Sequence, residues 1–232
     1  MRTFFRVAIA ALAVGGMSLA SPVQAGLVMT ITDNQGTTPV VVNGTPAGGT
    51  GSDLVANFSG TFGGAQIIVS VGDSNSPSLS DPVRLNTSVL VSGGTVPAGD
   101  VITVTVTDNG VTFPTGSNLT LKSSAAANAA GNGSMTYQST AAGTSTPLQT
   151  IPAGSTTNSV VTAPISGSVS SPYTIQGVTS LTFAAGGTPS ASVVNSLEVT
   201  AVPEPGSVIV WSLVACSLGL PGLRRRRVCG NS

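Results

Sequence analysis

Histidine is absent from this 232-residue chain, and cysteine occurs only twice, as Cys216 and Cys229 near the C-terminus. Segment 26–202 therefore contains neither residue type. This absence excludes Ser-His-Asp and Cys-His nucleophiles, histidine zinc sites and thiolate redox centres from the segment. It also means that burial and strand pairing hold the fold of this segment without a disulfide.

Charged and aromatic side chains are also scarce, at 7% and 4% of the chain. In segment 26–202 only Arg84 and Lys122 are cationic, against seven acidic residues, which gives a net charge of −5. Nucleic acids and anionic lipid surfaces require clustered Lys and Arg, so neither is expected as a partner. These absences leave glycosidases that act through two carboxylates as the one possible class of enzyme. Such enzymes usually bind sugars with aromatic rings, which are scarce in this chain. We therefore predict a protein that is not an enzyme and carries no cofactor.

The N-terminal segment has the pattern of a secretory signal peptide. Arg2 and Arg6 precede an apolar stretch from Val7 to Ala20, and small residues at Val23 and Ala25 follow. Charge, apolar core and small-residue site in this order are typical of a segment that is removed during export. We expect residues 1–25 to be the signal peptide, with cleavage after Ala25.

The C-terminal segment combines three features. Pro203, Glu204 and Pro205 come first, and the two prolines favour an extended, accessible backbone. Residues 206–223 then carry no charge, and their length is close to the roughly 20 residues with which a helix crosses a bilayer. The cluster Arg224, Arg225, Arg226 and Arg227 follows, and it should stay on the cytoplasmic side. From the residues alone, a single transmembrane helix is expected, either as an ordinary anchor or as part of a processing signal.

These three features together resemble the PEP-CTERM sorting signal of Gram-negative bacteria. The resemblance covers residues 203–227 and implies that an exosortase, an integral-membrane enzyme, recognises Pro203, Glu204 and Pro205. It also implies export across the inner membrane, transient anchoring by the C-terminal helix, and delivery to the cell surface or extracellular matrix. The overhang 228–232 is slightly longer than the pattern. The resemblance implies a route and no activity for segment 26–202.

Segment 26–202 is rich in Ser, Thr, Val, Gly and Ala, which favours short strands and turns. We expect one all-β domain, an antiparallel β-sandwich of roughly ten strands, with helices confined to the two terminal segments. The clearest strands are 100–107 and 83–92, where apolar and polar residues alternate. The sequence Asp108-Asn109-Gly110 predicts a hairpin turn after the first of these. The other expected strands cover 27–32, 40–42, 54–58, 65–71, 119–122, 159–163, 173–183 and 192–200.

Residues 123–154 have a weak apolar signal, which predicts a long loop or an irregular edge hairpin. The triplet Pro-Ala-Gly occurs at 46–48, 97–99 and 152–154. The sequences around the three copies differ, so we interpret the triplet as a recurring turn before a strand and not as a duplication.

Asp33, Asp73 and Asp108 are candidate calcium ligands, because each is followed closely by an asparagine and could present oxygen atoms. None of the three lies in a twelve-residue calcium loop. All three lie where turns are expected, and the side chains of Asp and Asn stabilise turns by accepting hydrogen bonds from nearby backbone N–H groups. The turn interpretation is therefore favoured, and no metal is predicted.

The leading hypothesis from the sequence is an exported, non-catalytic structural or adhesive protein of the cell surface, extracellular matrix or biofilm. Its expected partners are an exosortase-type processing enzyme and the polysaccharide matrix. The alternative is a carbohydrate-binding module, assisted by calcium, that acts on exopolysaccharide.

Overall fold

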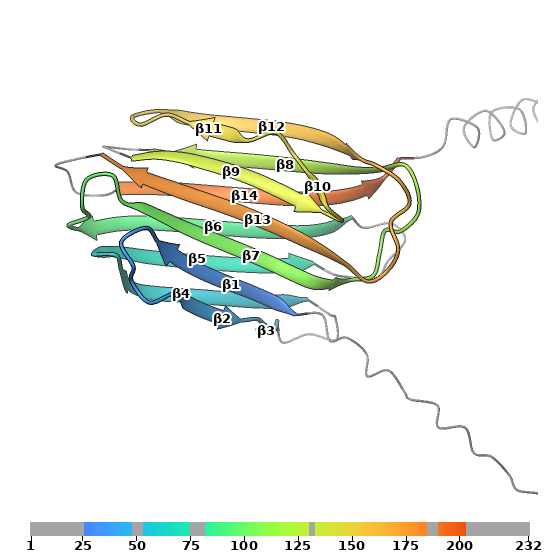
Figure 1. Ribbon diagram of the computed structural model, residues 1–232, viewed down its shortest axis with the longest axis horizontal. Coiled ribbons are helices and arrows are strands. Elements are labelled where there is room, and N and C mark those ends of the chain that lie inside the picture. The colour runs from blue at the N-terminus through green and yellow to red at the C-terminus, as the bar shows by residue number, and fades with distance from the viewer. Residues whose placement is uncertain (1–25, 48–52, 75–81, 130–132, 185–189, 203–232) are drawn as a thin grey trace, which may run out of the picture.

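The computed structural model describes residues 26–47, 53–74, 82–129, 133–184 and 190–202 (Figure 1). These residues form an all-β fold of two antiparallel sheets and contain no helix, as the sequence predicts. No helix that could span a membrane is therefore found in this part of the chain. The predicted signal peptide 1–25 and the predicted sorting signal 203–227 lie outside the described residues.

The first sheet has β2 at one edge and β10 at the other, and several of its neighbouring strands are far apart in the sequence. Its central strands β13 and β7 pair along most of their length. Short β11 pairs with β9 beside β10. Across the sheet the strands are β10 (Thr144–Ser145), β9 (Gly133–Ala141), β13 (Tyr173–Phe183), β7 (Val101–Val111), β1 (Leu27–Asp33) and β2 (Val40–Asn43), with β11 (Gln149–Ile151) off this path.

The second sheet places β14, the last strand, between β6 and β8. All ten strands predicted from the sequence are present in the two sheets, several of them longer than expected. Across the sheet the strands are β12 (Thr156–Ile165), β8 (Leu119–Asn128), β14 (Ser190–Ala201), β6 (Val83–Gly94), β5 (Ala65–Ser74), β4 (Leu54–Phe62) and β3 (Thr45–Pro46).

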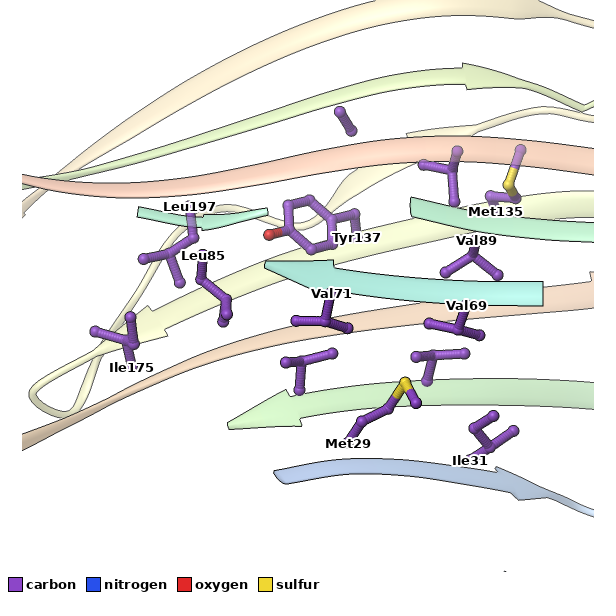
Figure 2. Close-up of a cluster of buried hydrophobic side chains, with 14 of the residues drawn as sticks. Met29, Ile31, Val69, Val71, Leu85, Val89, Met135, Tyr137, Ile175 and Leu197 are labelled. Atoms are coloured by element: carbon purple, nitrogen blue, oxygen red, sulfur yellow. The ribbon is translucent and has the colours of Figure 1, made fainter. Parts of the chain in front are cut away.

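One hydrophobic core fills the space between the sheets. The predicted alternation holds in β7, where Ile102, Val104 and Val106 are buried, and in β6, where Leu85 and Val89 are buried. Figure 2 shows side chains from both sheets in this core, among them Met29 and Ile31 from β1, Val69 and Val71 from β5, and Tyr137 from β9. Most of the core is aliphatic, so its stability derives from the burial of many modest side chains.

Of the two alternatives predicted for residues 123–154, the long loop is wrong, whereas an edge hairpin is present in part, because β9 and β10 pair at the edge of the first sheet. In the structure β8 extends to Asn128 inside the second sheet, and β9 lies inside the first, paired with β13 over nine residues. The inward positions carry small residues such as Ala125 and Ala127. Serine and alanine each occur on both faces of β8, with Ser123 and Ala125 inward and Ser124 and Ala126 outward, so this stretch gives no period-two signal in the sequence.

Buried hydrogen bonds replace apolar contacts in this part of the core. Ser139 Oγ on β9 donates to Ser123 Oγ on β8 at 2.9 Å, which joins the two sheets. Gln149 Nε2 on β11 donates to the same Ser123 oxygen at 2.8 Å. Buried polar groups are stable only when they are paired in this way, so the network specifies how β8, β9 and β11 pack.

The predicted hairpin at Asp108-Asn109-Gly110 is also wrong, because β7 continues through these residues to Val111. The pairing of β7 with β13 shifts between Tyr173 and Ile175, where β7 has one extra residue. Asp108 Oδ1 accepts a hydrogen bond of 2.9 Å from the backbone N–H of Gly110 at this point. The turn-forming sequence therefore makes a β-bulge inside a strand.

Two of the three Pro-Ala-Gly triplets form the predicted turn before a strand. Asp100 N donates to Pro97 O, and Ser155 N donates to Pro152 O, with the glycine of each triplet at positive φ. Strands β7 and β12 begin directly after these turns. Gly48 of the third triplet lies outside the described residues.

The two ends of the sandwich differ in what they hold. We call the end where β1 begins and β14 ends the proximal end; it lies to the right in Figure 1 and includes Leu27, Asp108 and Ala201. We call the opposite end, where β1 ends and β7 begins, the distal end; it includes Asp33 and Asp100. Both termini of the described segment 26–202 therefore lie at the proximal end.

Candidate functional site

The charged side chains of the described residues fall into three groups. Arg84, Lys122 and Glu198 lie on neighbouring strands of the second sheet. Two separate groups of aspartates occupy the ends of the sandwich. Asp53, Asp73 and Asp108 make up the proximal group, and Asp33 and Asp100 make up the distal pair. The remaining acidic residue of segment 26–202, Asp81, lies outside the described residues.

The first group places one acid between the two cations of the segment. Glu198 on β14 is directly opposite Arg84 on β6 and Lys122 on β8. Its carboxylate oxygens lie 3.9 Å from Arg84 Nη2 and 3.7 Å from Lys122 Nζ. Both cationic side chains are about half exposed, so each pair contributes little to stability. Their main effect is to concentrate the positive charge of the described residues around one carboxylate.

The proximal group brings together aspartates from both sheets. Asp73 lies near the end of β5, Asp53 directly precedes β4, and Asp108 lies on β7 of the facing sheet. Asp73 and Asp108 are buried. Burial, a hydrogen bond to Asp108 and the negative charges of Asp108 and Asp53 raise the pKa of Asp73 to about 9. Asp73 is therefore protonated at neutral pH.

Tyr173 borders the proximal group. It is buried, and no donor or acceptor among the described residues pairs with its hydroxyl. Burial and the charge of Asp108 raise the pKa of this phenol. The structure thus brings together two of the three calcium candidates, Asp73 and Asp108. However, no group of three or more acidic side chains among the described residues is arranged to hold a metal ion.

The third calcium candidate, Asp33, lies at the distal end, where it closes a turn. Its Oδ1 accepts hydrogen bonds from the backbone N–H groups of Gln35 at 3.1 Å and Thr37 at 2.9 Å. Burial acts to raise the pKa of Asp33, but the hydrogen bonds from Thr37 and Gln35 outweigh it and lower that pKa. Asp33 is therefore ionised at neutral pH. The turn predicted from the sequence is confirmed.

Asn34 fixes this turn against the segment that precedes β7. Its Nδ2 donates to Gly99 O at 3.1 Å, and its Oδ1 accepts from the backbone N–H of Val101 at 2.9 Å. Both side-chain atoms of Asn34 are thus paired with the backbone on either side of Asp100. This clamp holds the carboxylates of Asp33 and Asp100 on the same side of the distal end.

Asp100 is completely buried, with an exposed fraction of 0%. Neither of its carboxylate oxygens, nor Asp33 Oδ2, is paired with a donor among the described residues. Burial, and then the negative charge of Asp33, raise the pKa of Asp100 against a weaker opposing effect of the Val101 N–H. The two aspartates therefore have opposite pKa shifts although they are neighbours.

Gly63, in the turn between β4 and β5, completes the distal site. A Cβ atom on Gly63 would stand 3.3 Å from Oδ2 of Asp33 and 3.3 Å from Oδ2 of Asp100. The two oxygens are therefore at most twice that distance apart. Gly63 adopts a φ of +56°, and its missing side chain leaves space beside both oxygens.

A cleft of about 430 Å³ opens at the distal end beside this pair. Asp33 and Gly63 line the cleft, so the site is reached from solvent. The rest of the lining combines polar and apolar groups and consists of Gln35, Thr37, Thr61, Phe62, Gly64, Thr95 and Pro97.

Sequence reasoning missed Asp53, Asp100 and Tyr173 as members of these groups. The scarcity of acidic residues was a usable signal, because Asp53 directly precedes the predicted strand 54–58 and Asp100 is the first residue of the predicted strand 100–107. Which strand ends meet depends on the strand order, and that order is not encoded in local patterns. The other predicted site residues, namely Ala25, Pro203, Glu204, Pro205 and Arg224 to Arg227, lie outside the described residues.

Comparison of the chain with known protein families, with curated proteins and with solved structures found no match. Function is therefore inferred from the residues of this chain.

Proposed function

We propose that this chain is an exported, non-catalytic structural or adhesive protein, sorted by the PEP-CTERM route to the cell surface or extracellular matrix. The observation that carries the proposal is the order of Pro203-Glu204-Pro205, the apolar run 206–223 and the four arginines at 224–227. The predicted N-terminal signal peptide supplies the matching entry into the export pathway. An exosortase-type enzyme is the proposed processing partner, and the polysaccharide matrix is the proposed destination.

The properties of segment 26–202 support a structural role. Its aspartates serve local packing: Asp33 and Asp108 accept backbone hydrogen bonds, and Asp73 is buried near Asp108 in the interior. The cations Arg84 and Lys122 pair with Glu198. With both cations paired, the described residues offer no cluster of Lys and Arg to a nucleic-acid partner.

Replacing Pro203, Glu204 and Pro205 by alanine tests the route. We expect the variant to remain in the inner membrane with its tail intact, because the peptide that the processing enzyme recognises is gone. The measurement is fractionation of the native organism combined with mass spectrometry of the mature C-terminus. Release at the wild-type level, with the same C-terminus, would refute the sorting proposal.

A matched control makes the same chemical change elsewhere in the chain. The triple variant Pro39→Ala, Pro152→Ala, Glu198→Ala also removes two prolines and one glutamate. Both prolines are exposed and Glu198 lies on the outer face of the second sheet. This variant should be released and processed like the wild type.

The distal cleft favours a second candidate, a carbohydrate-binding module that acts on exopolysaccharide with the help of calcium. Gln35, Thr37, Thr61 and Thr95 line the cleft with amide and hydroxyl groups, the chemistry that pairs with sugar hydroxyls. A glycan array probed in calcium and in chelator tests this candidate. Binding that Thr61→Val weakens would support it, and the absence of any glycan binding would remove it.

A further inference from the structure

We propose that Asp33 and Asp100 bind one Ca²⁺ ion at the distal end of the sandwich, beside Gly63. Asp100 was not among the calcium candidates of the sequence, and Asp33 was favoured there as a turn residue only. The inference is independent of the export route, because it concerns only the described residues. It would also supply the ion of the second candidate function.

The argument begins with Asp100, which is fully buried and has two carboxylate oxygens without a donor among the described residues. A buried carboxylate is strongly unfavourable unless it is paired, protonated or bound to a cation. Arg84 and Lys122, the cations of the described residues, lie near Glu198 and do not neutralise it. The proton or cation that neutralises the Asp100 carboxylate must therefore come from solution.

Asp33 presents a second carboxylate oxygen to the same space. Its Oδ1 accepts two backbone hydrogen bonds, while its buried Oδ2 is unpaired and lies beside the space that Asp100 Oδ2 also borders. One divalent cation in this space would neutralise both carboxylates at once.

The type of ligand selects a hard cation. The polar atoms beside Gly63 are the two carboxylate oxygens, with Ile102 Cδ1 as an apolar neighbour, and segment 26–202 has no histidine and no cysteine. Ca²⁺ binds oxygen ligands at about 2.3–2.6 Å with flexible geometry and accepts water in its shell. The limit on the separation of the two Oδ2 atoms allows Ca²⁺ to contact both, directly or through water. The adjoining cleft gives solvent access.

The proximal group does not offer the same site. Asp73 is protonated at neutral pH, so one negative charge of this group is already neutralised, and Asp73 and Asp108 are buried between the sheets. Asp73 therefore provides a matched control for Asp100, because both are buried aspartates at strand ends. The proposed ion lies at the end of the sandwich opposite Val202.

Isothermal titration calorimetry on the full chain in detergent micelles, with CaCl₂ and without any glycan, tests the proposal. We expect one Ca²⁺ per chain, with a dissociation constant on the order of 10⁻⁴ to 10⁻³ M, as for extracellular calcium modules. Asp100→Asn and Asp33→Asn should each weaken binding at least tenfold. Asp73→Asn should bind like the wild type.

Several results would overturn the proposal. One is the absence of calcium binding by the wild type. Another is wild-type affinity in both Asp33→Asn and Asp100→Asn. Loss of binding in Asp73→Asn alone would move the ion to the proximal end. If circular dichroism shows that Asp100→Asn does not fold, Asp33→Asn decides, because its amide oxygen still accepts the hydrogen bonds of the turn.

Discussion

Asn195 and Thr179 join the two sheets through a hydrogen bond in the middle of the core. Asn195 Nδ2 on β14 donates to Thr179 Oγ1 on β13 at 2.7 Å, and both residues are buried. A polar pair in an aliphatic interior is compatible with only one alignment of the facing strands. The bond therefore fixes how the sheets are placed over each other.

Thr179→Val should destabilise the protein by about 1–3 kcal/mol, because it keeps the shape of the side chain but leaves the buried Asn195 amide without its acceptor. Urea denaturation followed by circular dichroism measures the change. Thr182→Val, on the exposed face of the same strand, should stay within about 0.5 kcal/mol of the wild type. Combining Thr179→Val with Asn195→Leu should recover part of the loss. Strict additivity of the two changes would contradict the pairing.

The strands with β-branched residues could be predicted from the sequence, and those with small residues could not. In β7 valine and isoleucine alternate with threonine, so the inward face is visible as a pattern. In β8 the buried Ala125 is flanked by Ser124 and Ala126, which differ little from it in hydropathy. The packing of β8 depends on hydrogen bonds such as the one from Ser139 to Ser123, which links residues on different sheets.

Ala125→Leu should destabilise the protein by about 1–3 kcal/mol or more, because Ala125 is fully buried and the added volume has no space. Ala126→Leu is the matched control, since Ala126 points outward on the same strand. Thermal unfolding of the two variants should differ clearly. Equal stability of the two variants would show that the inward face of β8 is assigned incorrectly.

Asp73 should make the protein less stable as the pH rises. Its pKa is raised from 3.8 to about 9 in the folded state, so between about pH 4 and pH 9 the folded state holds a proton that the unfolded state has lost. The free energy of unfolding should fall with pH in this window, by at most about 1.4 kcal/mol per pH unit. Asp73→Asn should flatten that dependence.

Urea titrations at several pH values between 5 and 9 measure this slope. Glu198→Gln, which changes a carboxylate on the outer face of the second sheet, is the control and should keep the wild-type slope. An unchanged slope in Asp73→Asn would mean that Asp73 is ionised in the folded protein.

Gly64 and Gly36 allow the cost of a close backbone approach to be measured separately from the cost of positive φ. Their φ values are +83° and +84°, but a Cβ on Gly64 would meet the carbonyl oxygen of Thr95, whereas one on Gly36 would meet nothing within 4 Å. Gly36→Ala should therefore cost about 1 kcal/mol, the conformational term alone. Gly64→Ala should cost clearly more in the same denaturation assay, and equal losses would contradict the contact.

The distal site shows why the sequence could identify single residues but not their grouping. Asp33 stands out because it opens a turn, and that prediction is confirmed. Its partner Asp100 is 67 residues away in the sequence and reaches it only because β1 and β7 pair antiparallel. The clamp by Asn34, which bonds to Gly99 and Val101, depends on the same pairing.

The position of β14 determines how the fold would respond to a mechanical load. The chain leaves the described segment at Val202, whose N–H donates to Asn118 O at 2.8 Å, directly after a strand paired with both β6 and β8. Force applied along β14 through the residues that follow acts parallel to two ladders of hydrogen bonds and loads them in shear. The hydrogen bonds to β6 and β8 then share the force. A pull perpendicular to an edge strand such as β12 would instead break its hydrogen bonds to β8 one at a time. The described segment therefore ends on a strand that resists a load along the chain better than an edge strand would.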